Sequence, residues 1–194
     1  MKRPTVLTQI QKNYRALNQG RRELIAKSNE ALSKSKRAIF ALHRNDHKEA
    51  ETLVADATTL FSGVEKMFRA LPTLKEEGSY RAALEEYAEA RLFAGYLSQG
   101  KIIALESRAS EPTVYLAGLS DMTGELVRYA TRQVTLGNRH VVKDVQEVVT
   151  MVIEFLLDVD LTGYLRTKFD QAKKNLSRLE QMSYDVAIRE RTDL

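Results

Sequence analysis

The 194-residue sequence has no cysteine and no tryptophan, and it contains only three prolines and three histidines. Without cysteine the chain can form no disulfide, thiolate zinc site, iron–sulfur cluster or cysteine nucleophile. It also has no Glu-x-x-His pair, which carboxylate-bridged di-iron bundles carry on their metal-binding helices. These absences favour a reducing compartment and argue against an oxidase or a ferritin-like protein.

Long apolar runs are missing as well. No stretch approaches the roughly 18 uncharged apolar residues of a membrane span. The N-terminal sequence M-K-R-P-T-V-L-T-Q-I-Q-K lacks the continuous apolar region and the cleavage site of a signal peptide. With 43% hydrophobic and 29% charged residues, the composition is that of a soluble globular chain. We therefore expect a cytoplasmic protein with no membrane partner and a single domain over residues 1–194.

Positive charge is concentrated at the N-terminal end. Residues 1–44 carry eleven basic and two acidic side chains, a net charge of +9, whereas the remainder carries −5. Such an asymmetry suggests that the N-terminal segment contacts a polyanion, although a solvated basic helix has the same composition.

Helix breakers are rare, and apolar residues recur at spacings of three and four, so the sequence predicts an all-α chain of about six or seven helices. Prolines, glycines and capping residues mark the boundaries. Asp46 followed by Glu49 resembles a capping box, and Ser79 is a candidate cap for the next helix. The expected helices cover about 5–44, 46–71, 79–105, 112–136, 141–157 and 163–191.

The first of these helices is predicted to be cationic on one face. On a helical wheel four basic residues fall within about 100° of one another, opposite an apolar side that packs. The four are Lys27, Lys34, Arg37 and Arg44, and the apolar residues are Leu24, Ala31, Leu32, Ile39 and Leu42. Because no aromatic residue interrupts this basic stripe, we expect it to contact phosphates without reading bases.

Two later helices each carry a pair of carboxylates. Glu86 and Glu89 stand at i, i+3 in a segment that is apolar nearly all round, and Asp121 and Glu125 stand at i, i+4. Like charges at these spacings need a compensating cation. An arginine or lysine from a neighbouring helix, or Arg128 beside Glu125, provides one solution. Alternatively, two helices with a pair each can build an oxygen-rich site for Mg²⁺ or Mn²⁺.

Four segments resemble the translin superfamily, in order and spacing along nearly the whole chain. They are S-K-R-A-I-F-A-L-H-R (35–44), L-E-E-Y-A-E-A (84–90), Y-L-A-G-L-S-D-M-T-G-E-L-V-R (115–128) and Y-D-V-A-I-R-E (184–190). The sequence is most similar to the translin-associated protein X branch, whose active site uses E-x-x-E on one helix and D-x-T-G-E on another. It resembles a stand-alone prokaryotic or archaeal member.

The resemblance implies a translin-like helical bundle that assembles into a closed homo-octameric shell and cleaves RNA on its inner surface. Carried over by position, Glu86, Glu89, Asp121 and Glu125 are the expected catalytic and metal-binding acids, with Mg²⁺ or Mn²⁺ as the cofactor. Lys36, Arg37 and Arg44 match the basic run of the family and are expected to hold RNA phosphates, together with Lys27 and Lys34 of the stripe. Glu190 stands where the family usually has glycine.

These expectations describe a metal-dependent endoribonuclease acting on single-stranded RNA, and possible substrates include short duplexes. Two alternatives stay open. One is a translin-like module that binds single-stranded RNA or DNA without cutting it. The other is a helical scaffold in which the acidic faces pair with the basic segment of another subunit.

Overall fold

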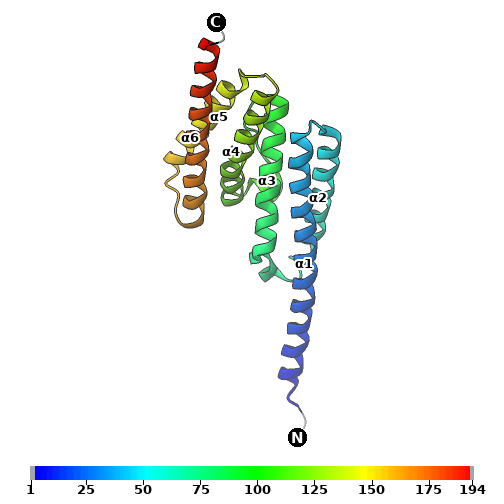
Figure 1. The fold of residues 1–194 in the computed structure, drawn as a ribbon. Coiled ribbons are helices and arrows are strands. Elements are labelled where there is room, and N and C mark those ends of the chain that lie inside the picture. Colours follow the sequence, from blue (N-terminus) through cyan, green and yellow to red (C-terminus); the bar gives the residue numbers. More distant parts are fainter. Residues whose placement is uncertain (1–2, 193–194) are drawn as a thin grey trace. The chain divides into compact units, whose positions relative to one another are not determined.

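The computed structural model describes residues 3–192, which form helices and no strand. The α-helices are α1 (Thr5–His43), α2 (His47–Met67), α3 (Gly78–Gln99), α4 (Pro112–Thr135), α5 (Val141–Asp158) and α6 (Gly163–Thr192), and the 3-10 segments are η1 (Pro72–Glu76) and η2 (Ser107–Ser110) (Figure 1). The predicted all-α class with about six or seven helices is therefore confirmed.

Capping and glycine geometry explain several of the helix boundaries. The Asp46 side chain accepts a 3.0 Å hydrogen bond from the backbone N–H of Glu49, as the predicted cap requires. α3 ends at Gln99 and not near Leu105, because Gly100 adopts a left-handed φ of 67° that stops the helix. The prediction that Ser79 caps this helix is wrong. Ser79 lies inside α3, and its buried hydroxyl makes no hydrogen bond within the described part of the chain.

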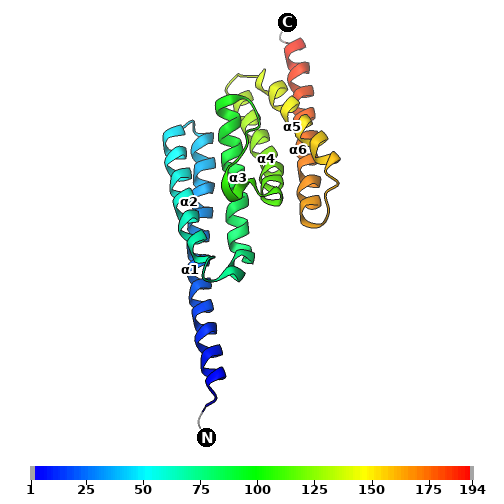
Figure 2. The same ribbon diagram turned by 180° about the vertical axis from the view of Figure 1, so that it is seen from behind.

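The chain divides into two compact units, one ending at Tyr87 and the other starting at Ala88, with the boundary inside α3. In the first unit α1 and α2 lie side by side in both views of the molecule (Figures 1 and 2). Buried apolar side chains line both helices: Leu24, Ala31, Ile39 and Leu42 on α1, and Leu53, Ala57, Phe61 and Val64 on α2. The apolar side that the wheel predicted for α1 thus forms part of this core, in which Leu32 is half-buried.

In the second unit α4, α5 and α6 pack against one another. The predicted packing side of α4 is buried, with Leu119, Met122, Leu126 and Ala130 each at most 2% exposed. A buried polar bond joins two of the helices, since Asn175 of α6 donates a 2.9 Å hydrogen bond to the hydroxyl of Thr123 in α4. None of the helices in the described part of the chain combines the length and the hydropathy that a membrane-spanning segment needs.

Candidate catalytic site and nucleic-acid interface

Glu86 and Glu89 are half-buried on α3, one turn apart, between the buried residues Leu84, Tyr87 and Ala88. Lys36 of α1 approaches the first of these acids in the first unit, with Nζ 3.8 Å from Glu86 Oε2. A lysine or arginine from a neighbouring helix was one of the two ways that the sequence suggested for compensating the negative charges of Glu86 and Glu89.

In the second unit, α3 and α4 meet backbone to backbone at Gly118. A Cβ placed on Gly118 would lie 2.7 Å from Ala88 Cβ and 2.9 Å from the backbone N of Glu89. Glycine is therefore required for this separation. Asp121 and Glu125 follow Gly118 by three and seven residues, so they stand on the same face of α4. The close approach thus brings the face with Asp121 and Glu125 against the segment of α3 that carries Glu89.

Each acid of α4 has a basic partner. Lys168 of α6 donates a hydrogen bond to Asp121 Oδ2 and forms an ion pair with it. Arg128 Nη1 lies 3.6 Å from Glu125 Oε2, which is the surface pair that the sequence suggested. Glu125 is mostly covered, and Asp121 is one-third exposed.

The Lys168 ammonium is held firmly in its charged form. Burial favours the neutral amine, but hydrogen bonds to Asp121 and Tyr164 and the charge of Asp121 outweigh it and raise the pKa of Lys168 above its usual range. The ammonium also lies 5.0 Å from the centre of the Tyr164 ring. Lys168 is therefore a cation at neutral pH.

The four candidate acids offer only carboxylate oxygens, which are the ligands that Mg²⁺ and Mn²⁺ prefer. They are Glu86, Glu89, Asp121 and Glu125. With the side chains as they lie, no three acidic or histidine residues in the described part of the chain gather closely enough to share an ion. The residue types and the α3–α4 approach at Gly118 fit a metal site, and the ion pairs would have to rearrange for the carboxylates to converge.

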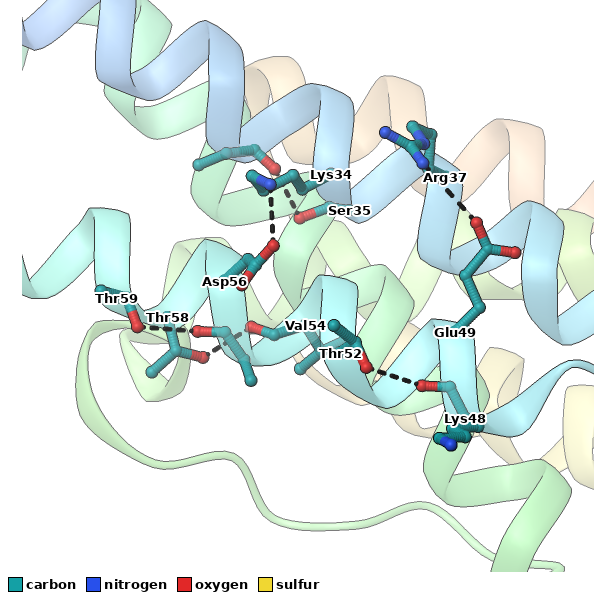
Figure 3. A network of polar contacts seen from close by, with 12 residues as sticks. Lys34, Ser35, Arg37, Lys48, Glu49, Thr52, Val54, Asp56, Thr58 and Thr59 are labelled. Carbon is teal, nitrogen blue, oxygen red and sulfur yellow. Dashed lines mark hydrogen bonds and ion pairs between the residues drawn. The ribbon is translucent and has the colours of Figure 1, made fainter.

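All five predicted RNA-binding cations lie in the first unit, and each has a carboxylate partner. Figure 3 shows Lys34 of α1 directed at Asp56 of α2, with 2.8 Å between Nζ and Oδ2, and Arg37 directed at Glu49. Arg44 shares Glu49 with Arg37, at 2.7 Å and 3.6 Å respectively. Lys27 pairs within α1 with Glu23 at 2.6 Å. Lys36 pairs with Glu86, as described above.

Two of the paired cations, Lys34 and Arg37, border a shallow depression of about 490 Å³ between α1 and α2. It is lined by Lys34, Arg37, Asp46, Lys48, Glu49, Thr52, Leu53 and Asp56. The cationic stripe is therefore partly neutralised by α2. Since two guanidinium groups share Glu49, positive charge remains in excess at the Arg37–Arg44 end.

Sequence reasoning missed three residues that matter here: Lys168, Glu49 as a partner of Arg37 and Arg44, and Asp56. The sequence predicted Glu49 only as half of a capping box, in which its side chain would accept a hydrogen bond from the backbone N–H of Asp46. Instead, the Glu49 carboxylate pairs with Arg37 and Arg44, and the Asp46 N–H donates to the carbonyl of Ala41. Lys168 is 47 residues from Asp121 and sits in a strongly charged helix. No local pattern separates it from its neighbours.

The chain matches the family model described as "Translin family" over residues 19–190. It is 27% identical to the translin-associated protein X homolog of Schizosaccharomyces pombe, over 92% of this chain and 86% of that protein. It is 24% identical to translin-associated protein X of Rattus norvegicus, over 86% of this chain and 72% of the relative.

Two solved structures have similar folds. One, described as the crystal structure of AfC3PO, superposes with a TM-score of 0.86 at 25% identity, covering 95% of this chain and 98% of the other. Another, described as apo-NeC3PO, has a TM-score of 0.84 at 22% identity and covers 96% and 100%. The family match extends over both units and over all nine candidate residues, so this chain belongs to the translin family.

Proposed function

We propose that the chain is a metal-dependent endoribonuclease that cleaves single-stranded RNA within a closed homo-octamer. The observation that carries this proposal is the backbone contact at Gly118, which aligns the Asp121–Glu125 face of α4 with the turn of α3 that bears Glu89. A purely binding protein has no need to hold like charges in such a mostly covered place. Glu86, one turn earlier on α3, completes the proposed set of acids.

Relatives support an RNA substrate. A structure of AfC3PO, 24% identical to this chain and with a TM-score of 0.84, is described as a complex with duplex RNA. The curated relatives are translin-associated proteins X, the branch whose acids the sequence matches. On the protein side, Lys36, Arg37 and Arg44 supply exposed positive charge for phosphates, with Lys27 and Lys34 adding to the field.

In the proposed reaction the oxygen of a water molecule bonds to phosphorus as the water gives up one proton, one P–O ester bond breaks, and the leaving oxygen takes up one proton. A Mg²⁺ or Mn²⁺ ion bound to the carboxylates would supply the Lewis acidity that this hydrolysis needs. The residues of the chain have three tasks: the basic residues hold the phosphate backbone, the carboxylates hold the ion, and the α3–α4 contact keeps the helix faces that carry Glu89, Asp121 and Glu125 together before substrate arrives.

The second candidate is a translin-like protein that binds single-stranded RNA or DNA without cutting it. It is favoured by the ion pairs on Glu86, Asp121 and Glu125, which show that basic residues alone can compensate these acids.

A cleavage assay separates the two. End-labelled single-stranded RNA is incubated with the protein in Mg²⁺, in Mn²⁺ and in excess chelator. We expect cleavage in either metal and none in chelator. Glu89→Gln should abolish cleavage and keep RNA binding, while Glu180→Gln, an exposed acid of α6, should behave as the wild type. RNA that is bound and stays intact in both metals would establish the binding protein instead.

A further inference from the structure

We infer that Lys168 lowers the affinity of the carboxylate site for metal, because its ammonium occupies Asp121 and competes with a divalent cation for that carboxylate. This inference rests on the proposed function, because it takes Asp121 to be a metal ligand. Nothing in the sequence pattern or in the family comparison assigns Lys168 a role.

The position of Lys168 is well defined. Its side chain is 14% exposed and that of Asp121 is 33% exposed, so the pair is partly shielded from water. The ammonium has Asp121 on one side and the ring of Tyr164, one turn earlier on α6, on the other. Partly buried pairs are screened less than surface pairs, so the charge of Lys168 acts strongly on Asp121.

The register between α6 and α4 is set independently of this pair. The buried hydrogen bond from Asn175 to Thr123 joins the same two helices two turns further along α6. Lys168 is thus held toward α4 by the packing of the whole helix. By contrast, Arg166 and Lys173 pair with Asp170 of their own helix.

The charges then determine how a metal ion must bind. Asp121 and Glu125 lie one turn apart, and Lys168 offsets the charge of the first. A divalent ion that binds Asp121 either displaces the ammonium or binds beside it, and in both cases it works against a fixed positive charge. Removing that charge should therefore tighten metal binding, even though it leaves the carboxylates less compensated when no ion is bound.

The test is a Mn²⁺ titration of the full-length protein, in which free Mn²⁺ is measured by electron paramagnetic resonance. We expect Lys168→Met and Lys168→Gln to bind Mn²⁺ on the order of tenfold more tightly than the wild type. Lys168→Arg keeps the charge and should bind like the wild type. Lys173→Met is the matched control, because it removes a cation of α6 that contacts none of the proposed ligands, and it should leave the affinity unchanged.

Two further measurements fix the interpretation. In an Asp121→Asn background, Lys168→Met should no longer change the Mn²⁺ affinity, since the effect acts through that carboxylate. In excess chelator, Lys168→Met should melt below the wild type, and Mn²⁺ should raise its melting temperature more than that of the wild type. A lysine with a merely structural role would, on removal, weaken Mn²⁺ binding.

Equal or weaker Mn²⁺ binding by folded Lys168→Met or Lys168→Gln overturns the inference, and so does the absence of Mn²⁺ binding in every variant. The proposed function is judged separately, by RNA cleavage. A wild-type protein that cleaves no RNA, together with tighter Mn²⁺ binding in Lys168→Met, would support the inference and contradict the proposed nuclease activity. Metal-dependent cleavage by the wild type, together with an unchanged Mn²⁺ affinity in Lys168→Met, would support the nuclease and overturn the inference.

Discussion

Lys36 Nζ lies 3.8 Å from Glu86 Oε2, so a predicted phosphate ligand and a predicted catalytic acid are direct neighbours within the first unit. A phosphate bound to Lys36 would therefore lie next to Glu86. The five cations that the sequence grouped together are therefore not equivalent. Lys36 is 56% exposed and loosely paired, whereas Lys34 is 23% exposed and held by Asp56 at 2.8 Å.

This difference ranks the two lysines for RNA binding. Lys36→Met should weaken binding of single-stranded RNA several-fold and reduce the slope of log K against log salt by about 0.7, the value for one phosphate contact on a single strand. Lys34→Met should change both quantities less, because the Lys34 ammonium is already engaged. Fluorescence anisotropy in excess chelator, at several salt concentrations, measures both. Equal losses in the two variants would contradict the ranking.

Glu49 restrains two of the predicted RNA ligands at once. Glu49→Gln removes the negative charge that Arg37 and Arg44 share, so we expect RNA to bind several-fold more tightly with a steeper dependence on salt. The loss of stability should be within about 1 kcal/mol, since both arginines are largely exposed.

The matched control for this variant is Glu51→Gln, which removes an exposed acid from the same helix two residues away. Its effect on RNA affinity should be smaller than that of Glu49→Gln. If both variants bind RNA equally tightly, the gain comes from net charge alone and Glu49 has no special position.

Tyr96 gives the second unit a defined response to alkaline pH. Burial, assisted by Tyr129 and Asp144, raises the pKa of Tyr96 to about 12. Because this folded-state pKa lies above the unfolded value of about 10, the stabilising contribution is complete below about pH 10 and is lost as pH rises through about 12.

The loss attributable to Tyr96 should be about 2–3 kcal/mol. Denaturant unfolding of the wild type and of Tyr96→Phe across this range measures it, since the variant has no phenol to ionise at this position. The gap between their free energies of unfolding should shift in favour of Tyr96→Phe as the pH rises. A gap that stays constant would show that Tyr96 ionises as an ordinary exposed tyrosine does.

The helices could be predicted from the sequence because their signals are local. Proline at 112, the Asp46 cap and the three- and four-residue apolar spacing depend only on neighbouring residues. α2 begins directly after Asp46 and α4 begins at Pro112, where these signals place them. The end of α3 was placed too late, because the break at Gly100 is a left-handed backbone conformation that the apolar pattern hid.

The ion pairs could not be predicted in the same way. The wheel identified a cationic face on α1, but it could not show that α2 presents Asp56 and Glu49 to it. Likewise, the need for a cation near Asp121 was clear from charge alone, whereas its identity as Lys168 depends on how α6 packs on α4. Whether Glu86, Glu89, Asp121 and Glu125 hold a metal ion stays a prediction.

Gly118 is the position where a single methyl group should test the proposed site most directly. An added Cβ would meet Ala88 Cβ at 2.7 Å and the backbone N of Glu89 at 2.9 Å, so α3 and α4 must separate in Gly118→Ala. We expect a net loss of stability of about 1–3 kcal/mol, because this overpacking outweighs the gain in helix propensity, which is at most about 1 kcal/mol.

RNA cleavage should fall by more than the loss of folded protein explains, because the displaced face carries Asp121 and Glu125. The control is Gly78→Ala at the start of α3, where the new Cβ would meet no atom within 4 Å. That variant should keep wild-type activity and stability or gain slightly. Thermal melts combined with cleavage rates under conditions where both variants are folded make the comparison. Full activity in a destabilised Gly118→Ala would show that the α3–α4 separation does not position catalytic groups.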